Sequence, residues 1–194
     1  GSPAARVASF GGTNFFKPDN AGYIEKLGKN RDGKDAYRTW PGPVNENPFT
    51  SDKDIIDNQV AIIEFANGVR STFHTNCNTA VPERRMYICG TEGTLRADVV
   101  VGSIELRRIG FETETEDCST DAKGGHGGGD NVLGESLAAS MLRGEAPKAS
   151  LEDGLKSAIT AFGMDEAMAT GRVVDMRPYW ERAGIEFVPA AAIA

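Results

Sequence analysis

One stretch of this chain combines residue types that can bind a polar ligand: at 124–130, five glycines surround a histidine and an aspartate follows. Glycine loses the most entropy on ordering and also adopts shapes closed to other residues, so the run indicates either a flexible loop or a special backbone. An amphipathic pattern begins at once, with Leu133, Leu137 and Met141 on one helical face. We expect Asp130 to cap the first turn of that helix.

The glycines therefore bring free backbone N–H groups and His126 to the start of a helix. Such a helix start suits a polar or anionic ligand, because the unpaired N–H groups and the helix dipole both favour one. A neutral imidazole can donate one hydrogen bond and accept another. The alternative interpretation is a mobile surface loop followed by an ordinary helix cap.

Other motifs with catalytic or metal-binding spacing do not occur in the sequence. There is no nucleophile elbow or phosphate loop, and the glycine run lacks the G-x-G-x-x-G spacing of a dinucleotide site. Cys77, Cys89 and Cys118 are odd in number and widely spaced, so they predict neither a disulfide framework nor a zinc site. His74 is interpreted as a sheet-surface residue rather than a ligand. We therefore expect no bound metal.

Charge and composition narrow the class of protein. The net charge of −7 argues against a nucleic-acid or anionic-membrane partner. No apolar run reaches transmembrane length and no signal peptide is evident. The unpaired cysteines are typical of a reducing compartment, so we expect a cytoplasmic protein. The chain of 194 residues is long enough for one large domain or two small ones.

The elements that position the glycine run are strands first and helices afterwards. The clearest unit is a hairpin whose turn, Asn67-Gly68, is typical of a type with φ > 0 at both positions. A first strand over 5–16 is expected to carry a bulge at Gly11-Gly12. Alternation of apolar and polar residues, together with tight turns, predicts four further strands and a short one near the C-terminus. These strands are predicted at 85–89, 94–101, 103–109, 111–116 and 173–176.

Residues 19–54 interrupt this pattern with a polar, aperiodic segment. A segment of that length inside a compact domain is unusual and often functional. We predict at most one short helix within it. Its apolar anchors are expected to be Tyr23, Tyr37, Trp40 and Phe49.

Two helices are predicted after the glycine run, over 130–143 and from Ser150 to about Thr170. The second should bury a stripe made of Leu151, Leu155, Ala158, Ile159 and Phe162. Strands followed by helices predict an α+β fold, with helices on one face of an open, mostly antiparallel sheet. The other face would then be open to solvent, a partner or a substrate.

Several sequence pieces occur in one order and together resemble a known family. The pieces are Ser9-Phe10-Gly11; 60–65 with Asn67-Gly68; Arg85 with 90–95; 125–130; Pro147 with 150–154; and Ala167 with Thr170-Gly171. This set resembles the C-terminal half of the glucose–fructose oxidoreductase, inositol dehydrogenase and rhizopine catabolism (Gfo/Idh/MocA) family. The likeness extends from about residue 5 to 180, and it implies a C-terminal domain like that of dihydrodipicolinate reductase.

The resemblance implies a division of labour between two domains. Intact members pair an N-terminal Rossmann domain with an α+β domain, and they transfer hydride between NAD or NADP and a sugar or cyclitol. Residues 3–188 would be the substrate-binding domain, which forms a homodimer or homotetramer through its sheet. The family's catalytic lysine and aspartate–histidine motifs have no match in this chain. The Rossmann half would hold the NAD or NADP cofactor, and this chain would bind no cofactor.

The resemblance also implies which residues contact the small polar substrate. His126, Gly127 and Asp130 match the family loop beside the substrate, and Arg85 and Lys17 are further candidates for orienting it. Two other functions stay open. The chain can instead belong to a non-catalytic binding or assembly module, or to a relative that uses NAD transiently to cleave glycosides.

Overall fold

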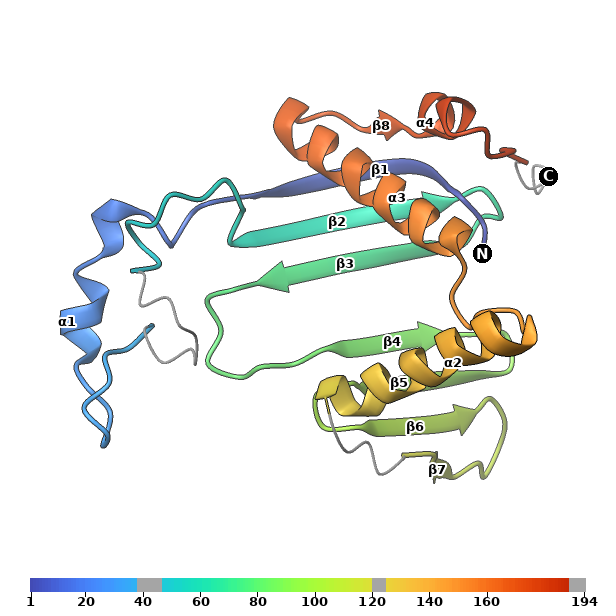
Figure 1. Cartoon of the computed structure of the whole chain (residues 1–194), viewed down its shortest axis with the longest axis horizontal. Helices are drawn as coiled ribbons and strands as arrows, with labels where there is room; N and C mark the ends of the chain where they lie inside the picture. The colour runs from blue at the N-terminus through green and yellow to red at the C-terminus, as the bar shows by residue number, and fades with distance from the viewer. Residues whose placement is uncertain (38–46, 120–124, 189–194) are drawn as a thin grey trace. The chain divides into compact units, whose positions relative to one another are not determined.

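The strands divide between two four-stranded antiparallel sheets, one in each of two compact units of the computed structural model (Figure 1). The structure describes residues 1–37, 47–119 and 125–188. Unit 1 comprises Gly1–Asn78 and Leu151–Ala194, and unit 2 comprises Thr79–Ser150. The predicted α+β class with open antiparallel strands and flanking helices is confirmed, with two sheets in the place of one.

The sheet of unit 1 has the order β3-β2-β1-β8 and supports the main core. Its strands are β1 (Ala4–Gly12), β2 (Asn58–Phe65), β3 (Arg70–Asn76) and β8 (Val174–Asp175). Helix α3 (Leu151–Thr170) packs on β1, as Figure 1 shows. Trp180, in the short helix α4 (Arg177–Arg182), is fully buried, and its indole N–H donates a hydrogen bond of 2.6 Å to the carbonyl oxygen of Ala4.

The buried stripe of α3 differs from the one predicted. Buried residues of this helix are Ile159, Gly163, Met164 and Ala167, whereas Leu151 and Phe162 are 90% and 60% exposed. The prediction was right for Ile159 alone, because the helix uses its C-terminal half to contact the sheet. Helical periodicity identifies an apolar stripe, but it does not show which part of the helix is covered.

Close packing explains the glycine at position 163 of α3, and a comparison with Gly154 in the same helix tests this. A Cβ on Gly163 would lie 2.2 Å from the Met176 sulfur, whereas a Cβ on Gly154 would meet no atom within 4 Å. We expect Gly163→Ala to lower the free energy of unfolding by about 1–3 kcal/mol through overpacking. Gly154→Ala should raise it by up to about 1 kcal/mol through helix propensity. Urea unfolding of both variants checks this, and equal effects would contradict the packing at Met176.

Two turn predictions in unit 1 are corrected by the structure. The β2–β3 hairpin forms, but only Gly68 has a positive φ, of 82°, and Asn67 does not. The Gly68 N–H donates to the Phe65 carbonyl at 2.9 Å, so the four-residue turn ends at Gly68, the left-handed glycine. The irregularity in β1 lies between Ala4 and Arg6, and regular pairing continues through Gly11. Gly11 is required by close approach instead, because a Cβ there would lie 2.3 Å from the Asn58 carbonyl oxygen.

The segment between β1 and β2 is tied down by aromatic side chains, as its sequence predicted. It holds one turn of 3-10 helix, η1 (Pro18–Asn20), and the short helix α1 (Tyr23–Leu27). Ring centroids of Tyr37 and Phe49 lie 5.5 Å apart. Phe15 contacts both of these rings as well as Phe16 and Tyr23. Phe49 is fully buried, and Trp40, the fourth predicted anchor, lies outside the described residues.

The sheet of unit 2 has the order β4-β5-β6-β7 and presents two unlike faces. Its strands are β4 (Arg85–Cys89), β5 (Gly93–Asp98), β6 (Ser103–Arg108) and β7 (Thr115–Asp117). Because side chains alternate along a strand, one face is apolar and the other is polar. The apolar face carries Met86, Ile88, Leu95, Ala97, Ile104 and Leu106. Helix α2 (Gly129–Arg143) completes the unit.

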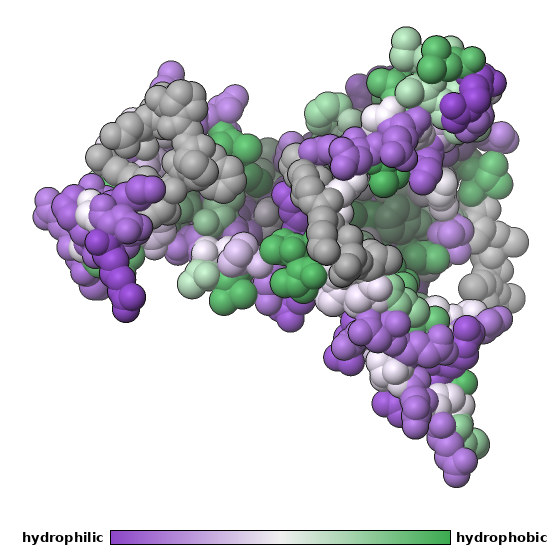
Figure 2. Space-filling model, turned by 60° about the horizontal axis from the view of Figure 1, so that its bottom comes forward, coloured by the Kyte–Doolittle hydropathy of each residue, from purple (hydrophilic) through white to green (hydrophobic). Residues whose placement is uncertain are grey.

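Apolar residues also reach the surface, as green patches among hydrophilic residues in Figure 2. The stripe predicted for α2 is one example: Leu133, Leu137 and Met141 are 57%, 61% and 77% exposed. Ala139 is the one buried residue of that helix. The predicted helix and its stop at Gly144 are confirmed, whereas its apolar face is not covered by the described residues.

Candidate functional site

The glycine run forms a turn whose backbone requires glycine. The single 3-10 turn η2 (Gly125–Gly128) leads directly into α2. Gly127 and Gly128 have φ values of 66° and 85°, in the left-handed region. Other L-residues pay about 1–2 kcal/mol to adopt this conformation. The sequence left open a flexible loop or a special backbone, and these two glycines adopt a backbone conformation that other residues rarely take.

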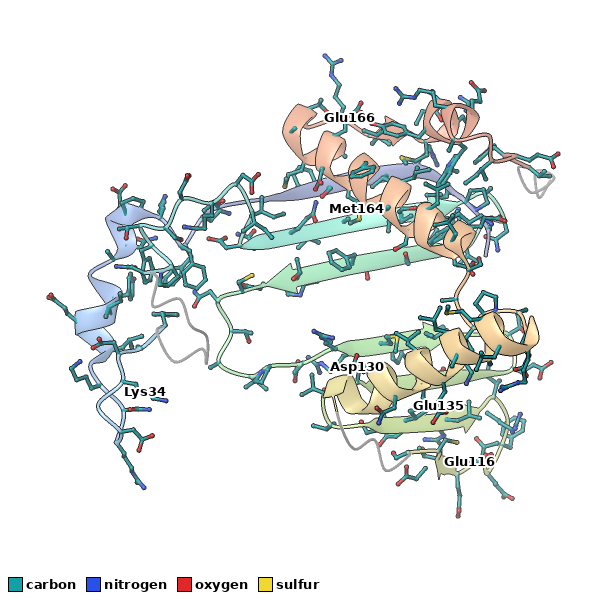
Figure 3. All side chains as sticks on the ribbon, viewed as in Figure 1. Lys34, Glu116, Asp130, Glu135, Met164 and Glu166 are labelled. Carbon is teal, nitrogen blue, oxygen red and sulfur yellow. The ribbon has the colours of Figure 1, made fainter. Side chains whose placement is uncertain are left out.

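Asp130 does not have the capping position predicted for it. The N-cap of α2 is Gly128, without a side-chain cap hydrogen bond, and the helix begins at Gly129. The left-handed glycine Gly128 places the N-cap two residues before Asp130, the residue predicted to hold that position. Asp130 lies instead in the first turn, as Figure 3 shows. A carboxylate at that place interacts favourably with the positive end of the helix dipole.

The turn lies beside the apolar face of the unit 2 sheet. Gly127 lines a hollow of about 170 Å³ together with Met86, Ala97 and Ile104, which share that face by strand register. His126 occupies the middle of η2, next to Gly127. The structure therefore brings the predicted residues 126, 127 and 130 together at one end of α2.

The two basic candidates lie elsewhere. Arg85 is the first residue of β4, and alternation places it on the sheet face opposite Met86. Its guanidinium forms an exposed ion pair of 2.8 Å with Glu83. Lys17 belongs to unit 1, where it is exposed and immediately precedes η1. Any contact of Arg85 or Lys17 with a substrate stays a prediction.

A buried carboxylate that the sequence analysis missed organises the residues before Lys17. Asp57 accepts hydrogen bonds from the backbone N–H groups of Asn14, Phe15 and Phe16 at 3.0, 2.7 and 2.7 Å. The side-chain amide of Asn58 donates a fourth, of 2.7 Å. Asp57 thus fixes the turn that follows β1. Its only signal in the sequence is an aspartate just before a strand, in a segment rich in other polar residues.

These hydrogen bonds stabilise the ionised form of Asp57. Burial raises the pKa of the carboxyl, but the N–H donors of Asn14, Phe16, Phe15 and Asn58 outweigh it and hold the pKa below the ordinary value of 3.8. The group therefore remains charged at neutral pH although only 5% of its surface is exposed. A charge with four donors is satisfied and needs no cation beside it.

Comparison with known proteins identifies the family. Residues 26–176 match the family described as "Oxidoreductase family, C-terminal alpha/beta domain", of the Gfo/Idh/MocA group. The chain belongs to the Gfo/Idh/MocA oxidoreductases. The match to this C-terminal domain contains His126, Gly127, Asp130 and Arg85, whereas Lys17 precedes it. A comparison with curated protein sequences gave no match.

Solved structures of other oxidoreductases share the fold of this Gfo/Idh/MocA domain. Levoglucosan dehydrogenase in complex with NADH and L-sorbose is 16% identical, with a TM-score of 0.62 over 90% of this chain and 45% of that one. An oxidoreductase from Agrobacterium radiobacter in complex with NAD+, L-tartaric acid and magnesium is 16% identical, with a TM-score of 0.59 and coverages of 91% and 44%. UDP-N-acetylglucosamine 3-dehydrogenase from Acidithiobacillus ferrooxidans is 12% identical, with a TM-score of 0.56 and coverages of 86% and 40%. The chain thus spans less than half the length of these proteins.

Among the described residues, the strand arrangement differs from the one that usually holds the pyrophosphate of a dinucleotide cofactor. Such a group rests on a glycine turn between a parallel strand and its helix, whereas every strand pair in the described ranges is antiparallel. In the described part of the chain, no group of three or more His, Cys, Asp or Glu residues is arranged to hold a metal ion. None of its helices is long and apolar enough to cross a membrane.

Proposed function

We propose that residues 3–188 form the substrate-binding and oligomerisation half of a cytoplasmic, NAD- or NADP-dependent oxidoreductase that acts on a sugar or cyclitol. The observation that carries this proposal is the glycine-shaped start of α2, which lies within the span matched to the family. The names of structural relatives agree with the substrate class, since they include levoglucosan and UDP-N-acetylglucosamine dehydrogenases.

The chemistry of the turn suits a polyol. Sugar hydroxyls both donate and accept hydrogen bonds, so they need acceptors and donors in alternation. The Asp130 carboxylate accepts from a hydroxyl, and His126 does either. Gly127 and Gly128 have no side chains, so a ring can approach the backbone N–H groups closely. The nicotinamide ring, held by the N-terminal half, would supply the hydride acceptor.

The test is a turnover assay on the intact protein with NAD and NADP against a panel of sugars and cyclitols. We expect reduction of one nicotinamide cofactor with at least one substrate. The 194-residue chain alone should neither turn over substrate nor bind either cofactor with a Kd below about 10 μM by calorimetry. Intact protein without turnover on any substrate would favour the non-catalytic binding or assembly module. Tight cofactor binding by the chain alone would show that it contains a cofactor site.

The proposed oligomerisation uses the outer face of the unit 1 sheet. Strand alternation places Phe10, Val60 and Ile62 on the face opposite the core, where they are 74%, 47% and 58% exposed. An ion-pair cluster of Arg6, Glu64 and Arg70 lies along the same face. Exposed apolar residues next to charged ones are typical of an interface between subunits.

We expect the chain to form dimers or tetramers that bury more than roughly 1,200 Å². Ile62→Lys should shift the assembly towards monomer, because it would bury an unpaired charge at the interface. Val101→Lys is the control, since Val101 is 73% exposed and belongs to unit 2, in the turn between β5 and β6. Light scattering at micromolar concentration measures the mass of each. A monomeric wild-type chain would contradict the proposed assembly.

A further inference from the structure

The polar face of the unit 2 sheet holds a concavity separate from the glycine turn. The hollow has a volume of about 300 Å³, which is within the range of small-ligand sites. Strand register explains its lining. Tyr87, Arg96 and Glu105 pair across β4, β5 and β6 in one row, and Thr94, Arg107 and Thr115 pair across β5, β6 and β7 in the next. Both rows lie on the face opposite Met86 and Ala97, so the hollow and the glycine turn use opposite faces.

Arg107 is the arginine of this lining that has no ion pair with a described residue. Arg96 pairs with Glu105 at 3.1 Å, and Arg108, at the rim, pairs with Glu116 at 3.5 Å. Arg107 forms no ion pair or side-chain hydrogen bond with any residue in the described ranges. The hydroxyls of its strand neighbours, Thr94 and Thr115, are likewise without a partner among these residues.

The local charge is positive although the whole chain is acidic. Three guanidinium groups and one carboxylate line the hollow. Glu116 compensates Arg108 from outside, and Asp117 continues the row of Glu105 on β7, beyond the lining. Arg107 itself forms no ion pair with a described residue. The net charge of the chain is −7, so this excess is a feature of the hollow and not of the protein as a whole.

We propose that this hollow is a second binding site, for a small ligand that carries a phosphate or carboxylate group. The guanidinium of Arg107 matches either oxyanion by two parallel N–H donors. The hydroxyls of Thr94 and Thr115, on the strands to each side, complete the set of donors to the same group. The Tyr87 ring, from β4, provides an aromatic wall for the rest of the ligand.

The experiment is a titration of the ¹⁵N-labelled 194-residue chain with inorganic phosphate and, in a separate arm, with succinate, at constant ionic strength set by sodium chloride. We expect saturable NMR shifts centred on the side-chain Nε–H of Arg107 and the amides of Thr94 and Thr115. A Kd of about 1 mM is the expected order for one charge-assisted group. The arm with the lower Kd identifies which oxyanion the site prefers.

Arg107→Gln should weaken binding by roughly 10- to 100-fold, because it removes a charge-assisted pair of hydrogen bonds. Arg172→Gln is the matched control, since Arg172 is an exposed arginine of unit 1, and it should leave the Kd unchanged. Thr115→Val, at the edge strand, should weaken binding about tenfold or less with an unchanged fold. The proposal is overturned if neither probe gives saturable shifts, if both arginine variants behave alike, or if the shifts centre on the glycine turn before α2.

Discussion

Replacing His126 by alanine in the intact oxidoreductase should lower kcat/KM for its substrate by roughly 10- to 1000-fold. The lower figure corresponds to a lost hydrogen bond to a substrate hydroxyl, and the upper to lost acid–base assistance. Folding should change little, because His126 lies between glycines in the η2 turn. Steady-state kinetics and a thermal melt of the variant measure both quantities.

His74 is the natural control, since it is the only other histidine of the chain. It lies on β3 in unit 1 and pairs with Val60 on the face proposed for oligomerisation, so light scattering must show that His74→Ala keeps the wild-type mass. With the assembly unchanged, His74→Ala should change kcat/KM by less than about twofold, as expected for a residue outside the substrate site. Wild-type kinetics in the His126 variant would show that the glycine run is an ordinary surface loop without a role in catalysis. A large fall in its melting temperature would give His126 a structural role instead.

The second large effect is expected for Asp57→Ala, which should lower the free energy of unfolding by about 2–4 kcal/mol. Removal of the Asp57 carboxylate leaves the backbone N–H groups of Asn14, Phe15 and Phe16 without their acceptor. The ordering of the following aromatic cluster depends on this turn, since Phe15 and Phe16 both contact Phe49. Asp54→Ala is the control, because Asp54 is exposed and should change stability by less than about 0.5 kcal/mol.

The same carboxylate predicts a dependence of stability on pH. The pKa of Asp57 is lower in the folded chain than its ordinary value of 3.8, because hydrogen bonds from Asn14, Phe16, Phe15 and Asn58 outweigh burial. The contribution of Asp57 to the free energy of unfolding is therefore fully present above the pKa that its carboxyl has in the unfolded chain. This contribution is lost as the pH falls through the lower pKa of the folded chain. Denaturant unfolding between pH 7 and about pH 3 measures the free energy of unfolding. This free energy should fall less on acidification in Asp57→Ala than in wild type. Identical pH profiles would show that Asp57 does not stabilise the fold through its charge.

Local signals in the sequence predicted much of the fold. Alternation and tight turns located β4 over Arg85–Cys89 at both ends, and the stop of α2 at Gly144 followed from one left-handed glycine. The aromatic anchors Tyr37 and Phe49 were also found, because large apolar side chains in a polar segment must pack somewhere. Each of these features depends on neighbours within a few residues or on strong hydrophobicity.

Features that depend on distant partners could not be predicted in this way. The acceptor role of Asp57 joins residues 41 to 43 positions apart, and no local pattern marks it. The covered half of α3 depends on where β1 lies, so the stripe that includes Leu151 was assigned wrongly. In the candidate site, residues 126, 127 and 130 lie together because they are close in the sequence. Arg85 faces the other side of its sheet, which strand direction and register decide.

The interrupted sequence of unit 1 has a consequence for synthesis on the ribosome. Unit 2 is one continuous stretch, Thr79–Ser150, whereas unit 1 needs Leu151–Ala194 as well as the first 78 residues. The N-terminal strand β1 obtains its α3 cover, its β8 neighbour and the Trp180 hydrogen bond to Ala4 only after that last segment has emerged. Since domains fold as units and synthesis adds about 5–20 residues per second, β1 waits for roughly 10–30 s with its apolar face uncovered. A nascent chain of which only the residues up to 150 have left the ribosome should therefore present a folded unit 2 and an unprotected β1 to chaperones and proteases.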